Sequence, residues 1–261
     1  MRKNLHIRKR LRHQIHKEEE LLPFTGKDRG FLMGKSLMVI LILNYFFYQS
    51  FWAFLPLLCV GILYYRMERQ LLYQRKKDQA REQFKELMLL VSAGQKAGYS
   101  AENAFLSSYG DMKALYGQDS SICRMICILK SGRKNNISFI SLWKRMGRQL
   151  NIAEISEFAC IYEIAYKSSG NMAAVMEKTA LIIVHKIETD NEIKVLLSAR
   201  RLEQKIMNVM PFFIILYISL TSPGYFNGLY HSVWGALIMS LCLLIYLGAY
   251  ALSVQIISIE V

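Results

Sequence analysis

Charged residues are absent from two stretches of the chain and frequent between them. Residues 206–259 contain no Asp, Glu, Lys or Arg, and residues 36–65 form a second uncharged run. A helix that crosses the hydrocarbon core of a bilayer needs about 20 apolar residues. The C-terminal run is therefore long enough for two crossings, and Pro223-Gly224 near its middle predicts a turn. This pattern predicts a membrane protein with a charged domain between two apolar regions.

The first apolar run admits two interpretations. Lys35 precedes it, and Arg66 and Arg69 follow it. Because positive residues tend to stay on the cytoplasmic side, both flanks are expected there, and the run then crosses an even number of times. This favours a hairpin of two short helices, at about 33–48 and 51–65, over one tilted helix that places the N-terminus outside. The C-terminal pair is expected at about 206–221 and 232–254, with the loop between them outside.

Five segments follow from this topology. They are a basic cytoplasmic tail (1–32), a transmembrane hairpin (33–65), a cytoplasmic helical domain (66–205), a transmembrane helix pair (206–254) and a short cytoplasmic C-terminus (255–261). No proline lies between residues 66 and 206, and the segment is rich in Glu, Lys, Leu and Ala, which favour helices. The expected fold is all-α: a polytopic membrane protein whose cytoplasmic domain is an antiparallel helical bundle.

Within the central domain, helices are expected at about 101–109, 121–130, 139–150 and 152–168, followed by one unbroken helix over 172–221. Ser100 is the expected N-cap of the first of these. The Gly-Arg-Lys-Asn-Asn run at 132–136 is expected to be a loop. In the 152–168 helix, apolar residues recur at helical spacing and predict a buried stripe of Ile155, Phe158, Ala159, Tyr162, Ala165 and Tyr166.

The net charge of +13 is concentrated next to the apolar runs. Residues 1–35 carry ten Lys and Arg against four acids, and residues 66–81 carry six against two. Residues 82–199 are nearly balanced, with fourteen against twelve. This distribution indicates contact with a lipid membrane and gives no reason to expect a nucleic-acid partner.

No catalytic motif is present. The chain lacks G-x-x-x-x-G-K-[ST], H-E-x-x-H and G-x-S-x-G, so it has no P-loop, zincin or serine-hydrolase signature. The expected membrane spans carry no charged side chain to serve an ion pathway or an intramembrane protease. Cys123 and Cys127 are one helical turn apart, but no neighbouring His or Cys completes a metal site, so both are expected to be buried. We expect neither enzymatic activity nor a cofactor.

Two stretches resemble a known family. One is Leu89–Phe105, an apolar helix followed by Ala-Gly-Tyr-Ser-Ala and then Ala104-Phe105. The other runs from Ser169-Gly170-Asn171 through a basic junction at Arg200 to a helix that contains Pro211. Together they resemble the type II secretion system F family over residues 85–255. A single F domain between paired membrane segments is most similar to the TadB- and TadC-like proteins of tight-adherence (Tad/Flp) pili.

The resemblance implies a non-enzymatic platform in the inner (plasma) membrane that couples a cytoplasmic secretion ATPase to pilin assembly. The implied partners are that ATPase, a pilin or pseudopilin, and a second F-family subunit or another copy of this chain. An alternative from a different class is a membrane sensor or a transport accessory subunit whose helical cytoplasmic domain relays a signal.

Six residues are candidates for partner contact or for tight turns. Gly98 and Gly170 fit turns or close helix approach, and Ser100 and Asn171 adjoin them. Glu154 and Glu157, with Glu163, form either an acidic face that binds a partner or an ordinary solvated helix face. The second interpretation is the one we expect.

Overall fold

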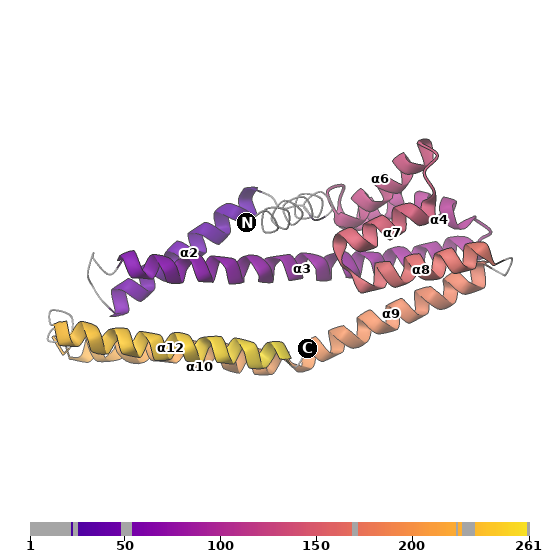
Figure 1. The fold of residues 1–261 in the computed structure, drawn as a ribbon. Coiled ribbons are helices and arrows are strands. Elements are labelled where there is room, and N and C mark those ends of the chain that lie inside the picture. Colours follow the sequence, from indigo (N-terminus) through magenta and orange to yellow (C-terminus); the bar gives the residue numbers. More distant parts are fainter. Residues whose placement is uncertain are drawn as a thin grey trace, which may run out of the picture. The chain divides into compact units, whose positions relative to one another are not determined.

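The computed structural model describes residues 22, 26–47, 54–168, 172–222, 224–225 and 233–259. Over these ranges the chain is all-helical and has no strand, which confirms that the fold is all-α. The helices are α2 (Gly26–Phe47), α3 (Phe54–Lys96), α4 (Ala101–Ser107), α5 (Tyr109–Tyr116), α6 (Ser121–Lys134), α7 (Phe139–Leu150), α8 (Ala153–Lys167), α9 (Met172–Leu196), α10 (Ser198–Thr221) and α12 (Val233–Ile259) (Figure 1).

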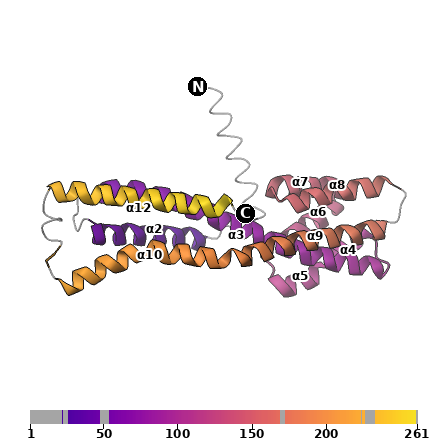
Figure 2. The same cartoon turned by 90° about the horizontal axis from the view of Figure 1, so that it is seen from below.

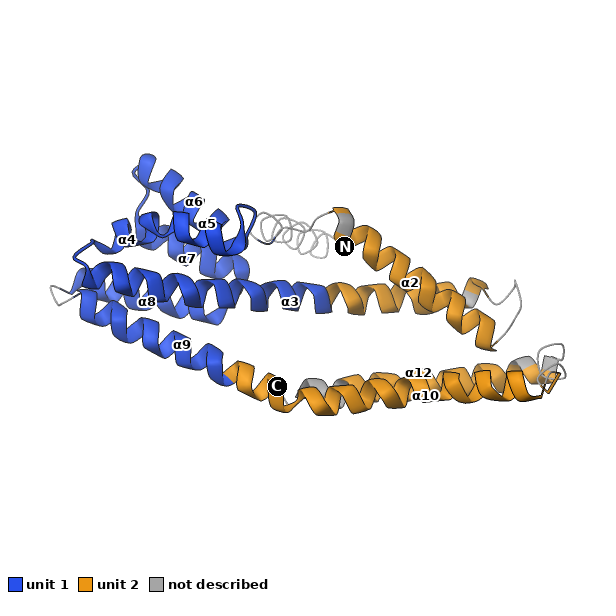
Figure 3. Ribbon diagram, turned by 180° about the vertical axis from the view of Figure 1, so that it is seen from behind, with its two compact units in different colours: residues 1–25, 71–189 blue, residues 26–70, 190–261 orange. Residues whose placement is uncertain are grey.

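The chain divides into two compact units (Figure 3). Unit 1 comprises residues 1–25 and 71–189, and unit 2 comprises residues 26–70 and 190–261. The chain passes from unit 2 to unit 1 within α3 and returns within α9. In sequence, most of unit 1 is therefore an insertion between the two parts of unit 2.

Unit 1 is built around a cluster of aromatic side chains. Phe84 of α3, Phe105 of α4, Trp143 of α7 and Phe158 of α8 are all fully buried. Ring centroids lie 5.1 Å apart for Phe105 and Trp143 and 5.1 Å apart for Trp143 and Phe158. At these separations, aromatic pairs stabilise a fold by more than the burial of their apolar surface alone contributes. Two pairs of consecutive helices, α3 with α4 and α7 with α8, thus meet at one centre.

The predicted apolar stripe on α8 is confirmed except at its last residue. Ile155, Phe158, Ala159, Tyr162 and Ala165 are buried in unit 1, whereas the Tyr166 side chain is 63% exposed. The Tyr166 ring stacks on the Tyr162 ring instead, with centroids 6.4 Å apart. One more turn of helix therefore carries the stripe out of the core.

Helix α6 is longer than the sequence predicts. It continues through Lys134, so the loop expected at 132–136 is wrong for its first three residues. Gly132 lies inside the helix at the point where α6 meets α7, and a Cβ on it would come within 2.3 Å of the Leu142 side chain. This glycine therefore allows close helix packing and does not end the helix. The turn falls on Asn135 and on Asn136, whose φ is +55°.

Two expected helices are each divided in the structure. The helix expected over 101–109 ends at Ser107, and a second helix begins at Tyr109. The helix expected to be unbroken over 172–221 is interrupted at Leu197, between α9 and α10. Backbone hydrogen bonds still span this position, from Leu197 N to Ile193 O at 3.0 Å and from Arg201 N to Leu197 O at 3.1 Å. Pro211 lies inside α10, which continues past it to Thr221.

In unit 2, α2 and α3 contact each other in antiparallel order. A Cβ on Gly61 would come within 2.3 Å of Ile40, and Lys35 donates to Glu68. As the residue number on α2 falls, that of its partner on α3 rises, so the two helices run in opposite directions. Helix α2 begins at Gly26, earlier than expected. Helix α3 begins at Phe54 and continues without a break past the apolar run to Lys96.

Helices α10 and α12 complete the apolar core of unit 2. Leu43 of α2, Leu57 of α3 and Met239 of α12 belong to one buried cluster, and Phe212 of α10 packs against it. The Tyr246 hydroxyl donates to the Asn208 carbonyl at 3.1 Å, which joins α12 to α10. Figure 2 shows α2 running alongside these two helices.

Among the described residues, three helical segments are long and apolar enough to cross a membrane. They are Asp28–Phe47, Met172–Thr221, which takes α9 and α10 together, and Leu237–Val254. Their presence supports a membrane protein, as the sequence predicts. The described part of α3, from Phe54 on, is not among them. The number of crossings made by the first hairpin and the side on which unit 1 lies stay predictions.

Candidate interaction site

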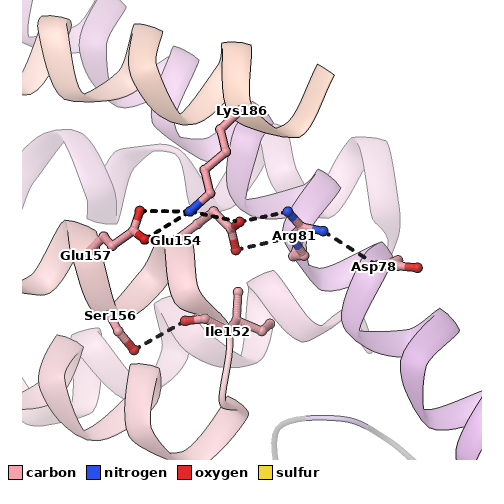
Figure 4. A network of polar contacts seen from close by, with 7 residues as sticks. All are labelled: Asp78, Arg81, Ile152, Glu154, Ser156, Glu157 and Lys186. Carbon is pink, nitrogen blue, oxygen red and sulfur yellow. Dashed lines mark hydrogen bonds and ion pairs between the residues drawn. The ribbon is translucent and has the colours of Figure 1, made fainter. Parts of the chain in front are cut away.

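An ion-pair network joins three helices of unit 1 (Figure 4). Glu154 of α8 accepts two hydrogen bonds from Arg81 of α3, from Nε at 3.1 Å and from Nη2 at 2.7 Å. Lys186 of α9 lies 3.7 Å from Glu154 and donates to both carboxylate oxygens of Glu157, at 2.9 and 3.1 Å. Asp78, one turn before Arg81, is 3.7 Å from the guanidinium. The network therefore binds α3 and α9 to the first turn of α8.

The local sequence explains why α8 begins at this network. Asn151 ends α7 in the left-handed conformation, with φ +49° and ψ +46°, and reverses the chain. Ile152 precedes α8, and its carbonyl accepts from the Ser156 hydroxyl at 3.2 Å. Glu154 stands in the first turn, where the helix dipole favours a negative charge. Gly147 lets α7 approach closely, since a Cβ there would meet Ser156 Oγ at 2.7 Å.

The two carboxylates of the network differ sharply in exposure. Glu154 is 3% exposed, whereas the Glu157 side chain is 51% exposed. The two-point contact with Arg81 compensates the buried charge of Glu154, since a buried carboxylate is tolerated only when it is paired and hydrogen-bonded. The hydrogen bond to Glu157 raises the pKa of Lys186 above its ordinary value, against the opposing effect of burial. The expectation of a solvated face is therefore wrong at Glu154 and holds only for Glu157.

Glu163, the third acid considered in this helix, belongs to a separate pair. It accepts hydrogen bonds from Lys144 of α7 and, at 3.0 Å, from Lys167 of its own helix. These two hydrogen bonds, that of Lys144 first, hold the pKa of the Glu163 carboxyl below its usual range. The three acids therefore do not form one uncompensated acidic face, because each has a cationic partner within unit 1.

Gly98 and Ser100 lie at the turn between α3 and α4. Gly98 has a φ of +92°, and its N–H donates to Gln95 O at 3.0 Å. The expected N-cap is present, because the Ser100 hydroxyl accepts from the backbone N–H of Asn103 at 3.4 Å. Both residues thus have a local backbone role. Gly170 and Asn171 lie outside the described residues.

Sequence reasoning missed the cationic half of the network. Arg81 stands between buried Ala80 and buried Phe84 on one face of α3. A charged residue within an apolar stripe indicates a buried partner, and this signal was available in the sequence. The partner itself is 73 residues away in the chain. Only the packing of α3 against α8 identifies it as Glu154.

A cavity of about 300 Å³ lies elsewhere in unit 1, beside the turn between α6 and α7. Its wall combines a carboxylate, a guanidinium and three aromatic rings, from Glu102, Arg133, Phe139, Tyr162 and Tyr166. Burial raises the pKa of the Tyr162 hydroxyl, with a smaller contribution from Glu102. The Arg133 guanidinium donates a hydrogen bond to the side-chain oxygen of Asn103 at 2.7 Å. The cavity therefore brings acidic, basic and aromatic side chains together in unit 1.

The described residues contain no group of three or more side chains that could hold a metal ion. Cys123 is buried as expected, but Cys127 is exposed, so the expectation of burial is wrong for the second cysteine. The two residues lie on the same side of α6, rotated from each other by only about 40° around the helix axis. Cys123 therefore lies in the buried face, and Cys127 lies at its exposed edge.

Comparison with known proteins gives no relative from which function could be transferred. No family model, no curated protein and no solved structure matches the chain.

Proposed function

We propose that this chain is a non-enzymatic platform of a type II secretion or Tad (Flp) pilus machine in the inner membrane. The proposal rests on the resemblance of residues 85–255 to the F family and on the helical character of unit 1. In this role, the helical domain lies in the cytoplasm between two transmembrane pairs and binds a secretion ATPase. The membrane helices contact a pilin or pseudopilin, and the platform includes a second F-family subunit or another copy of the chain.

One structural observation carries the proposal furthest. Helices α3 and α9 each contribute to the packed core of unit 1, through residues such as Phe84 and Ile183. Each also continues toward an apolar segment: α3 begins in one, and α9 leads through Leu197 to α10. A displacement imposed on unit 1 can therefore be transmitted along backbone-hydrogen-bonded helices to the apolar segments. Such a mechanical path is what a platform between an ATPase and a membrane substrate requires.

The network makes Glu157 the better of the two acidic residues for testing ATPase contact. Reversing Glu154 would place a cation against Arg81 inside unit 1, so lost binding would report lost folding. Glu157 is half-exposed and can be reversed at lower cost. Asp111 on α5 is also exposed and supplies a matched charge reversal on another helix.

The experiment is capture of the secretion ATPase by full-length protein in detergent micelles. We expect Glu157→Lys to weaken capture and Asp111→Lys to leave it unchanged. Added salt should weaken capture by the unsubstituted chain, because exposed charges are screened over about 10 Å at 0.1 M ionic strength. The isolated chain should hydrolyse no ATP. Normal pilus assembly by cells whose chain lacks residues 82–199 would refute the platform role.

A further inference from the structure

A cavity in unit 2 lies among α2, α3, α10 and α12. It has a volume of about 660 Å³, within the usual range for small-molecule sites. Most of its wall is apolar and comes from α2 and α10, including Val39, Leu43, Phe46, Phe212, Phe213 and Leu216. The remaining wall comes from α3 and α12. The cavity is therefore elongated along helices that the sequence assigns largely to the membrane.

One end of this cavity is apolar. The Phe46 and Phe212 rings meet edge to face there, with centroids 5.5 Å apart. Leu216 lies one turn beyond Phe212 on α10 and lines the same end. No charged side chain lines the cavity at this end.

The other end is polar. Lys205 and Leu216 both line the cavity and are eleven residues apart on α10, which corresponds to about 16 Å along a helix. The hydrogen bond from Tyr246 to Asn208 aligns α12 with α10, so Tyr250 lies level with Lys205. Tyr64 of α3 also lines the cavity and, in the antiparallel hairpin, lies near the Val39 end of α2. Two phenolic hydroxyls and one ammonium group therefore gather at one end.

The charge at this polar end is positive. Lys35 and Glu68 pair with each other and offset their charges. Lys205 is exposed, and no carboxylate of the described part of the chain lies within 4.0 Å of its ammonium. A ligand that fills the cavity would thus meet an apolar surface along its length and one uncompensated cation at its end. Basic pockets between membrane helices bind the headgroups of anionic lipids.

We propose that this cavity binds one anionic glycerophospholipid, with an acyl chain along α2 and α10 and the phosphate at Lys205. The tyrosine hydroxyls of residues 64 and 250 donate to headgroup or ester oxygens at the same level, as interfacial tyrosines do. The proposal depends on the membrane location of unit 2 and not on a role in secretion. Its test and the ATPase test can therefore fail separately.

Native mass spectrometry of the full chain in neutral detergent micelles tests the proposal. The probes are phosphatidylglycerol and phosphatidylcholine with identical acyl chains. We expect the chain to retain one phosphatidylglycerol and to retain phosphatidylcholine much more weakly. Lys205→Gln should lower phosphatidylglycerol binding about tenfold, the usual scale for losing a charge-assisted hydrogen bond. Arg200→Gln, which removes a charge from the same helix but not from the cavity wall, should change binding less than twofold, since a surface charge contributes little.

A second pair of variants tests the apolar end. Leu216→Trp should fill the cavity and reduce retention, whereas Leu220→Trp, on the exposed surface outside the cavity wall, should not. Circular dichroism verifies that all variants keep their helical content. Equal losses in Lys205→Gln and Arg200→Gln, or equal binding of the two lipids, would overturn the headgroup assignment. A lipid-free dimer that Leu216→Trp dissociates would instead identify a second copy as the occupant.

Discussion

The contact between Arg81 and Glu154 permits a quantitative prediction. Glu154→Gln keeps the size of the side chain but removes the charge that compensates a guanidinium whose side chain is 17% exposed. Removing one partner of a buried ion pair costs about 3–5 kcal/mol. Asp78, 3.7 Å from the guanidinium, supplies partial compensation, so the lower end of this range, about 3 kcal/mol, applies here.

Cys123 provides the assay, because its side chain is fully buried in the core of unit 1. The other four cysteines are replaced by serine in the full-length chain, and the rate at which Cys123 reacts with a thiol reagent reports opening of the unit. A loss of about 3 kcal/mol should raise this rate roughly a hundredfold, since each 1.4 kcal/mol corresponds to tenfold. The measurement needs no refolding and can be made in membranes.

Two controls separate charge compensation from general damage. Glu157→Gln alters an exposed pair and should change the reaction rate of Cys123 less than about fivefold. Replacing both partners, with Arg81→Met and Glu154→Leu, should restore much of the protection, because a buried ion pair can be exchanged for packed apolar groups. If Glu154→Gln leaves the rate within threefold of the parent, the reasoning about a compensated buried charge is refuted.

Three further predictions concern helix α9, the stability of the fold at acid pH and the membrane topology. Ile183→Pro and Val175→Pro each remove a helical hydrogen bond of α9 and should each cost about 3 kcal/mol or more. Unchanged Cys123 protection in either variant would contradict a continuous helix over these positions. The pKa of Glu163 is lowered in the folded state, so its pairing with Lys144 and Lys167 stabilises the fold fully above the ordinary carboxyl pKa of 4.5 and progressively less as pH falls through the folded pKa. Glu163→Gln should therefore reduce the loss of stability at acid pH, measured as stability against pH. An unchanged loss would contradict this. Single cysteines at positions 27, 130, 227 and 261 are labelled with an impermeant reagent, and only position 227 should react from outside. Labelling of position 27 from outside would instead support a single crossing by the first apolar run, residues 36–65.

Local signals in the sequence were sufficient for much of the helix pattern. The bounds of α7 match because Leu150 is followed by Asn151, which adopts the left-handed conformation that ends many helices. The N-cap at Ser100 was readable because the side chain acts within three residues of itself. By contrast, Gly132 signals a loop by composition but serves a contact with Leu142, which depends on where α7 packs.

The candidate site was less predictable for the same reason. Glu154 and Glu157 have the same residue type and lie three positions apart, yet one is buried and the other exposed. The difference depends on α3 and α9, which bring Arg81 and Lys186 from distant parts of the chain. The interruption at Leu197 is equally invisible in composition, since no glycine or proline stands there.

The insertion of unit 1 between the two parts of unit 2 has a consequence for synthesis on the ribosome. Leu43 and Leu57 are made early, but Met239 and Leu243, which share their cluster, follow almost two hundred residues later. At 5–20 residues per second, that interval is roughly 10–40 s. Unit 1 emerges complete in the meantime, so it can fold first. The apolar side chains of α2 and the start of α3 must spend this interval against lipid or an insertion factor, and their final partners arrive last.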